Sequence, residues 1–166
     1  MKSILSSYKE FLYSKNKLKF GSYKELHSWS VNEPSVFWDS IVSFFKIDFD
    51  KYSNHIYKPN KNFIKTQWFN GSKISYSKNV FKNDSLKTPA IKYQDETGEY
   101  SEISWNSLKI KTLEFQEILI KKNISVGDRV VGYCSNSPDV IAAFLAVNSL
   151  GAIWSSCSPD FGYDSV

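Results

Sequence analysis

The clearest pattern of hydrophobic and polar positions lies in residues 129–156, which read RVVGYCSNSPDVIAAFLAVNSLGAIWSS. The two ends of this stretch, residues 129–134 and 152–156, are short apolar runs that each predict a strand. Residues 138–150 lie between them and carry large apolar side chains on more than one face, which predicts a largely buried helix. The stretch therefore predicts a βαβ unit with two parallel strands, and an α/β fold with a larger sheet.

Residues at both ends of this helix support its boundaries. Asn136 or Ser137 can accept a hydrogen bond from the free amides of the first turn, and Pro138 fits the first helical position. Gly151 can adopt the left-handed conformation that ends a helix. The pattern therefore predicts the start and the end of the helix as well as its interior.

A hairpin and a further helix are predicted immediately before this unit. Residues 89–94 and 100–104 are strand-like runs joined by a polar turn, with Gly98 at its tight position. Ser104 is a good N-cap for a helix over residues 105–122, which carries an apolar stripe at helical spacing. The hairpin and this helix lead directly into the βαβ unit.

The N-terminal half predicts helices and irregular chain. Residues 3–20 are lysine-rich and weakly periodic, which predicts either a short helix or a frayed segment. Ser22 and Glu25 have the spacing of a capping box at the start of a short helix. Asn32 is the expected cap of a second helix, whose aromatic stripe is expected to pack in a core. Residues 47–65 show no sustained period and predict an extended surface connection.

The distribution of charge divides the chain at a polar join, residues 82–88, where we expect an internal boundary. Residues 1–83 hold 14 lysines against 6 acidic residues, whereas residues 84–166 hold 7 basic residues against 11 acidic ones. The basic half is suited either to steering an anionic ligand, such as a nucleotide or coenzyme A, or simply to solvation. Arg129 is the only arginine, and this composition argues against a reader of nucleic acid.

The composition argues against a membrane-spanning, secreted, disulfide-rich or metal-binding protein. No run approaches the roughly 20 apolar residues of a membrane span, and the N-terminus lacks the apolar core of a signal peptide, so we predict a cytoplasmic protein. Cys134 and Cys157 form no disulfide framework and no metal-binding spacing, and each is expected to be a buried or half-buried free thiol at the end of a strand. His27 and His55 are each expected to be a surface or capping histidine and not a metal ligand. The sequence thus predicts no metal site.

Two glycine motifs that bind nucleotides can be tested and rejected. Gly127 and Gly132 have the spacing of a phosphate loop, but Gly132 falls inside a predicted strand, where backbone amides cannot cradle phosphates. Residues 135–138 follow that strand and contain no glycine, so a dinucleotide fingerprint fails as well.

A ligand edge is nevertheless predicted, because ligands of parallel sheets bind beyond the carboxyl ends of the strands. Those ends are residues 134–137 and 156–162. Asp139, Asp160 and Asp164 are the carboxylates nearest to this edge. Asp139 is expected in the first turn of the helix, where the helix dipole stabilises it. Asp160 has two interpretations: a functional carboxylate at the ligand edge, or a turn residue that accepts backbone hydrogen bonds.

Several segments resemble the adenylate-forming acyl-CoA synthetases. Residues 68–79, WFNGSKISYSKN, are similar to a segment of the branches that act on acetate and acetoacetate. Residues 127–130 (GDRV), 136–138 (NSP) and 150–153 (LGAI) resemble the start of the AMP-binding domain throughout the superfamily. Residues 154–162, WSSCSPDFG, look more like the acetoacetate branch than the acetate branch.

The resemblance implies a domain organisation. Residues 1–21 would be a leading segment, residues 22–83 an N-terminal region of the acetyl-CoA-synthetase type, and residues 84–166 the truncated start of the AMP-binding domain. The implied fold is α/β, with a helical and irregular N-terminal region that leads into an incomplete βαβ sheet. We expect an N-terminal fragment that is inactive alone, with a new helix beginning at residues 163–166.

The resemblance also implies a reaction. ATP and acetoacetate would give an acyl-adenylate and pyrophosphate with Mg²⁺, and coenzyme A would then release AMP as acetoacetyl-CoA forms. The partners would be these small molecules, with neither nucleic acid nor membrane involved. The alternatives are another short-chain acyl-CoA synthetase, such as one for acetate, and a non-catalytic module that binds coenzyme A or a partner.

The family's catalytic and metal-binding motifs lie downstream of this chain, so the resemblance supplies no catalytic residue and no metal ligand. One loop matches a family position that lies along the coenzyme A channel. The resemblance implies that this loop is a wall of the channel, formed by Ser158, Pro159, Asp160, Phe161 and Gly162.

Overall fold

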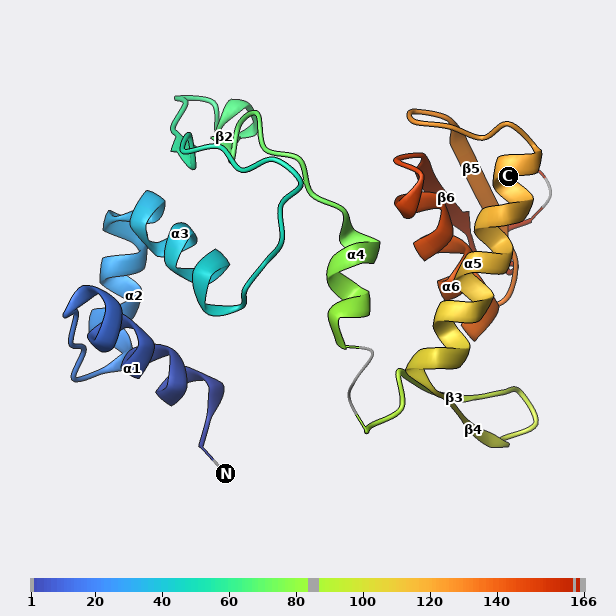
Figure 1. The fold of residues 1–166 in the computed structure, drawn as a ribbon, viewed down its shortest axis with the longest axis horizontal. Coiled ribbons are helices and arrows are strands. Elements are labelled where there is room, and N and C mark those ends of the chain that lie inside the picture. Colours follow the sequence, from blue (N-terminus) through green and yellow to red (C-terminus); the bar gives the residue numbers. More distant parts are fainter. Residues whose placement is uncertain (1, 84–86, 163, 165–166) are drawn as a thin grey trace. The chain divides into compact units, whose positions relative to one another are not determined.

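The computed structural model describes residues 2–83, 87–162 and 164 of the chain (Figure 1). It divides into two compact units, Met1–Ile74 and Ser75–Val166. The first unit ends before the polar join at residues 82–88, and residues 84–86 of that join lie outside the described part. The helix expected to begin at residues 163–166 also falls mostly outside it.

The first unit contains three helices around a small hydrophobic core. The helices are α1 Ile4–Asn16, α2 Tyr23–Asn32 and α3 Pro34–Phe44. Tyr8, Leu12 and Leu26 are buried at the centre. The half-buried side chains packed on them are mostly aromatic and come from all three helices and the α1–α2 loop: Phe11, Leu18, Phe20, Trp29, Phe37, Ile41 and Phe44. The predicted packing role of the aromatic stripe on α3 is thus confirmed.

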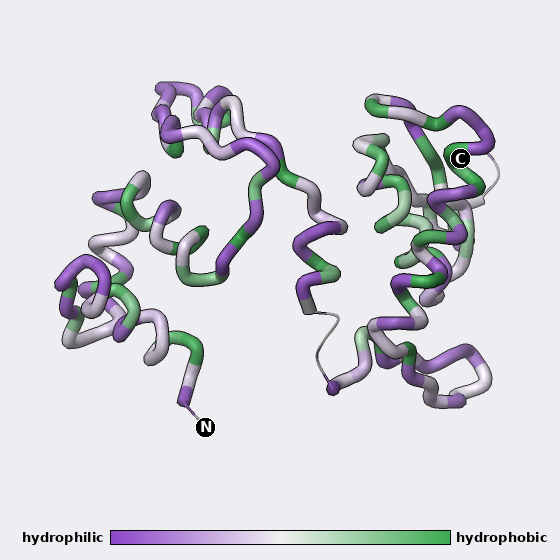
Figure 2. Tube along the Cα trace, in the orientation of Figure 1, coloured by the Kyte–Doolittle hydropathy of each residue, from purple (hydrophilic) through white to green (hydrophobic). Residues whose placement is uncertain are grey.

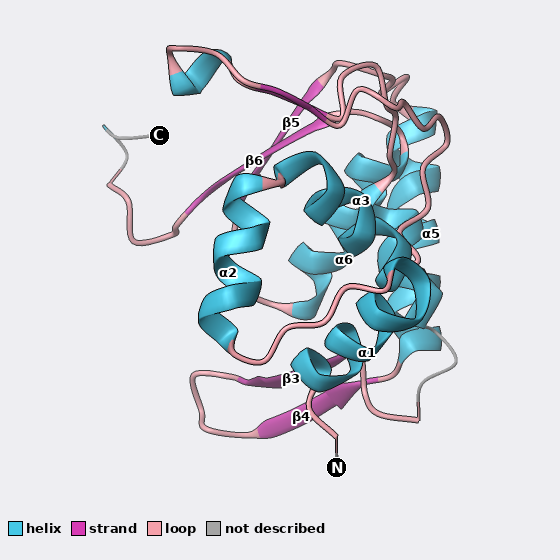
Figure 3. Cartoon of the chain, turned by 90° about the vertical axis from the view of Figure 1, so that its left-hand side faces the viewer, coloured by secondary structure: helices cyan, strands magenta, loops and turns pink. Residues whose placement is uncertain are grey.

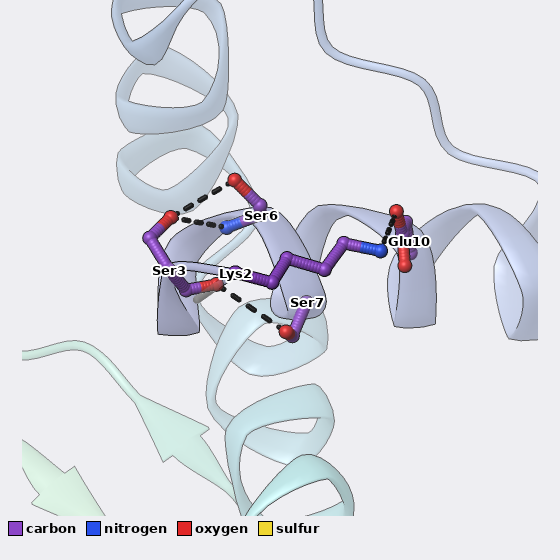
Figure 4. A network of polar contacts seen from close by, with 5 residues as sticks. All are labelled: Lys2, Ser3, Ser6, Ser7 and Glu10. Carbon is purple, nitrogen blue, oxygen red and sulfur yellow. Dashed lines mark hydrogen bonds and ion pairs between the residues drawn. The ribbon is translucent and has the colours of Figure 1, made fainter.

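Helix α1 shows that the leading segment is a well-formed helix and not a frayed one. The Ser3 hydroxyl accepts a hydrogen bond from the Ser6 backbone N–H at 3.2 Å, which caps the first turn (Figure 4). The Ser7 hydroxyl donates to the Ser3 carbonyl at 3.3 Å, and Lys2 pairs with Glu10 (Figure 4). The serines and the ion pair therefore compensate for the weak hydrophobic period.

The junctions of α2 and α3 confirm one predicted cap and correct another. The Ser22 hydroxyl accepts a hydrogen bond from the Glu25 backbone N–H at 3.2 Å, as a capping box requires. Asn32 is not the cap of α3, because α2 continues through Asn32 itself. The cap is Glu33, since Pro34 at the first helical position forces the preceding residue out of the helical conformation.

The prediction of an extended surface connection over residues 47–65 is wrong in part. A short helical turn, η1 Phe63–Lys65, and a two-residue strand, β1 Tyr57–Lys58, lie within it, and β1 pairs antiparallel with β2 Gln67–Trp68 just beyond it. The rings of Tyr57 and Trp68 lie 4.6 Å apart, directly opposite each other in this pair. Contact between aromatic rings therefore stabilises strands too short for a periodic signal.

The loop that follows α3 is tied to this helix by a hydrogen bond from the Tyr52 hydroxyl to the Asp39 carboxylate. Partial burial and this carboxylate raise the pKa of Tyr52 to about 12. Below pH ~10 the hydroxyl is neutral in both the folded and the unfolded chain. Between about pH 10 and 12 it ionises more readily in the unfolded chain, so folding stability is lost over this range.

We therefore expect Tyr52→Phe to reduce the loss of stability between about pH 10 and 12. The same substitution should remove the highest-pH step from the tyrosine ultraviolet titration. Asp39→Asn is the matched test, because it keeps the phenol and removes the charge that adds to the effect of burial, so the pKa of Tyr52 should move toward its ordinary value. An unchanged titration in Tyr52→Phe would show that Tyr52 is not the group that ionises at high pH.

The second unit combines a hairpin, a parallel strand pair and two long helices that pack together (Figures 1 and 3). Its elements are α4 Tyr76–Val80, η2 Phe81–Asn83, β3 Ile91–Gln94, β4 Tyr100–Ile103, α5 Trp105–Lys121, β5 Arg129–Tyr133, α6 Pro138–Ser149 and β6 Ile153–Cys157. Strands β3 and β4 pair antiparallel, and β5 and β6 pair parallel on either side of α6 in the sequence. The α/β fold and its βαβ unit are confirmed.

The core of this unit lies between α5 and α6. Leu108, Ala142 and Leu145 are buried there, with the half-buried side chains of the hairpin and of α4 around them. Helix α5 alternates hydrophobic and hydrophilic residues along its length (Figure 2), so one face packs on α6 and the other meets solvent. No helix in the described part of the chain is both long enough and apolar enough to cross a membrane.

Candidate functional site

The two predicted ligand-edge segments meet at one edge of the β5–β6 pair. Tyr133, the last residue of β5, lies opposite Cys157, the last residue of β6, in parallel register. Residues 134–137 and 158–162 therefore leave the sheet side by side. Strand β6 runs one residue further than expected, so Cys157 belongs to the strand and the loop begins at Ser158. Both cysteines are free thiols, as expected, and Cys157 is half-buried, but the expected burial is wrong for Cys134, which is exposed.

The loop 158–162 is shaped by local hydrogen bonds. The Phe161 backbone N–H donates to the Ser158 carbonyl at 3.0 Å. The Ser158 hydroxyl donates to the Asp160 carboxylate at 3.1 Å and accepts from the Asp160 backbone N–H at 3.3 Å. Asp160 thus lies in a turn, as one interpretation of the sequence held, but among the described residues its carboxylate accepts from the Ser158 hydroxyl instead of from the backbone. Pro159, Asp160, Phe161 and Gly162 are exposed.

Tyr133 is a component of this edge that the sequence did not indicate. Its hydroxyl donates to the Phe161 carbonyl at 3.0 Å and lies 3.3 Å from the Pro159 carbonyl. These contacts connect the end of β5 to the middle of the loop after β6. Its position as the last residue of a predicted strand could have indicated this role, because a tyrosine there places its hydroxyl at the ligand edge.

Gly132, rejected above as part of a phosphate loop, has a packing role. It lies in β5 with its backbone in the ladder, opposite Ser156. A Cβ atom at this position would lie 2.6 Å from the indole of Trp154, which crosses directly over the glycine. Trp154 also packs edge-on against Phe144 of α6, with ring centroids 6.3 Å apart. The indole therefore fills the space between the sheet and α6.

The start of α6 differs from the expectation in its cap. Ser137 occupies the cap position, but its side chain makes no capping hydrogen bond. Asp139 lies in the first turn, as predicted, and its carboxylate pairs with the Lys111 ammonium at 2.6 Å. This pair raises the pKa of Lys111. The contact joins α5 to α6 across 28 residues, a separation that leaves no local sequence signal.

Two hollows lie beside this edge within the second unit. A largely apolar groove of about 460 Å³ lies between α5, α6 and β5, with Phe115, Leu119, Val130, Val140 and Trp154 among its lining. A more polar hollow of about 590 Å³ lies between residues 93–97, at the end of β3 and in the hairpin turn, and residues 135–137. Among the described residues, no group of three His, Cys, Asp or Glu side chains could hold a metal ion.

Comparison with known proteins shows that the chain belongs to the AMP-binding enzyme family, whose sequence profile matches residues 80–166. Residues 23–80 match the profile of the acetyl-coenzyme A synthetase N-terminus. The enzymes of this family use ATP and coenzyme A and are ligases. The resemblance to the adenylate-forming synthetases is thereby confirmed.

Individual relatives are acetoacetyl-CoA synthetases. The Danio rerio enzyme is 33% identical over 151 residues, which cover 90% of this chain and 22% of that protein. The Rhizobium meliloti (strain 1021) enzyme is 29% identical over 147 residues, which cover 89% of this chain and 22% of the relative. The solved structure of the Streptomyces lividans enzyme matches with a TM-score of 0.86 and 29% identity, covering 94% of this chain and 24% of that one. The chain thus spans less than a quarter of the length of these relatives.

Proposed function

We propose that this chain forms the N-terminal part of an ATP-dependent acetoacetate–CoA ligase. Such a ligase converts acetoacetate and ATP to an acyl-adenylate and pyrophosphate, and then transfers the acyl group to coenzyme A. The observation that carries the proposal is that acetoacetyl-CoA synthetases match about nine-tenths of this chain, in sequence and in fold. Use of Mg²⁺ and a cytoplasmic location are part of the proposal.

Within that reaction, we assign the loop Ser158, Pro159, Asp160, Phe161 and Gly162 to the wall of the coenzyme A channel. Its place beyond the carboxyl ends of two parallel strands supports this role, because that edge is where ligands of α/β sheets bind. The loop presents exposed backbone beside the exposed ring of Phe161. This surface suits the pantetheine arm of coenzyme A, because that arm carries both amide and apolar groups. The proposal assigns no ATP contact and no Mg²⁺ ligand to the described residues.

A ligase for another short acyl group is the second candidate. It is favoured by a relative of different specificity, the malonamoyl-CoA synthetase vrtB of Penicillium aethiopicum, which is 30% identical over 162 residues and is matched over 22% of its length. The N-terminal profile is likewise named for acetyl-CoA synthetase. Both candidates place the same loop beside coenzyme A, so they differ in acyl group and not in the role of this chain.

The proposed function is tested by a chimera in which this chain replaces the matched segment of the Streptomyces lividans enzyme. We expect the chimera to form acetoacetyl-CoA and AMP, because the two segments share a fold over 94% of this chain. The parent enzyme is the positive control, and the parent without the segment and the 166-residue chain alone are expected to be inactive. A folded chimera that forms neither adenylate nor acetoacetyl-CoA would contradict the proposal.

A further inference from the structure

Tyr133 connects two segments that are far apart in the sequence. Its hydroxyl contacts carbonyls 26 and 28 residues away, at Pro159 and Phe161. The shorter contact, 3.0 Å to Phe161, is the main hydrogen bond, and the 3.3 Å contact to Pro159 shares the same proton. One side chain of β5 thus holds the carbonyls on both sides of Asp160.

The place of Tyr133 in the strand explains how its ring reaches the loop. Side chains alternate along a strand, so Tyr133 and Val131 point away from the face on which Trp154 covers Gly132. Val131 is 59% exposed and Tyr133 52% exposed. The ring of Tyr133 is therefore not fixed by a core, and its position follows from the strand and from the bonds of its hydroxyl.

The other hydrogen bonds that shape the loop are local. They join Ser158 to Asp160 and to Phe161, and they fix the turn but not its orientation relative to the sheet. A turn held only in this way can rotate about its attachment after Cys157, and this motion opens its own hydrogen bonds more often. A contact from the sheet to the turn limits that rotation, and Tyr133 supplies it.

We propose that Tyr133 is the positioning residue of the loop 158–162, and that its hydroxyl holds this loop in the orientation that leaves the coenzyme A channel open. The second half of this proposal, on the coenzyme A channel, rests on the proposed function, because the loop lines such a channel only if the whole protein is a synthetase. Tyr133 does not contact the reacting atoms in this role. It acts through the two carbonyls of the loop.

The first half is tested by hydrogen exchange of the backbone amides in the 166-residue chain. Tyr133→Phe keeps the ring and removes the hydroxyl, and we expect the amides of Asp160 and Phe161 to exchange about fivefold faster. Tyr100→Phe is the matched control, because Tyr100 is a 76% exposed tyrosine of the hairpin, and it should leave these amides unchanged. Unchanged exchange in Tyr133→Phe would overturn the positioning role.

The second half is tested by Tyr133→Phe in the Streptomyces chimera. We expect the KM for coenzyme A to rise about fivefold, while the rate of adenylate formation from ATP and acetoacetate stays the same, because coenzyme A enters only the second step. Faster loop exchange with an unchanged KM for coenzyme A would overturn the link to the channel. An inactive parent chimera would count against the proposed function, while the exchange experiment still decides whether Tyr133 holds the loop.

Discussion

Replacing Leu12 with alanine is expected to lower the free energy of unfolding of the first unit by about 2–5 kcal/mol. Leu12 is fully buried, with 0% of its surface exposed, and it packs with Tyr8 and Leu26 at the centre of the three helices. Truncation to alanine removes most of the apolar side chain and leaves a cavity that the aromatic neighbours fill only in part. Urea denaturation followed by circular dichroism measures the loss.

Leu5→Ala on the same helix is the matched control. Leu5 is 42% exposed, so the same truncation should change stability by less than about 1 kcal/mol. The comparison separates core packing from helix propensity, because both substitutions place alanine in α1. Equal losses for the two variants would mean that α1 does not pack into the core as the structure describes.

Replacing Gly132 with alanine is expected to destabilise the second unit by about 1–3 kcal/mol. The new methyl group would lie 2.6 Å from two atoms of the Trp154 indole, which no real contact tolerates, so the indole has to move. Trp154 in turn packs against Phe144, and its displacement disturbs the contact between the sheet and α6. Thermal or urea denaturation monitored by circular dichroism measures the change.

Two further variants make this prediction specific. Gly162→Ala adds the same methyl group where nothing lies within 4 Å, so it should cost far less. In a double-mutant cycle with Trp154→Leu, the cost of Gly132→Ala should shrink, because the smaller side chain leaves room for the methyl group. Additive costs in the cycle would refute a steric role for Gly132.

The second unit could be predicted from the sequence because its signals are local and agree with one another. Gly98 and Gly151 both adopt the positive φ angles that their predicted turns require, at 87° and 71°. Ser104 caps α5 by accepting a hydrogen bond from the Ser107 backbone N–H. Periodicity, caps and turn residues thus predict the same elements over the hairpin, α5 and the βαβ unit.

The first unit was harder to predict because its helices are stabilised by contacts that a short window does not contain. Helix α1 buries only Tyr8 and Leu12, so its apolar period is weak. The Tyr8 hydroxyl hydrogen-bonds the Ser40 hydroxyl of α3 at 2.6 Å, a contact between residues 32 positions apart. The two-residue strands β1 and β2 likewise depend on rings that meet only after folding.

The position of the candidate site could be predicted, but the contacts that hold it could not. Parallel strands place their carboxyl ends at one edge, so the meeting of residues 134–137 with residues 158–162 follows from the βαβ pattern alone. The hydrogen bond from Tyr133 to Phe161 and the pair of Lys111 with Asp139 each join residues 28 positions apart. Such contacts depend on which side chains come close together in the folded chain, so the sequence contains no periodic pattern that predicts them.

The close approach of Trp154 to Gly132 also restricts how these two positions can change during evolution. While an indole stands at position 154, any side chain at position 132 would collide with it, although the backbone there is an ordinary strand. A lineage that first acquires a small residue at position 154 is released from this restriction and can accept alanine or serine at position 132. The order of the two substitutions therefore matters, because position 132 can gain a side chain only after the residue at position 154 has become smaller.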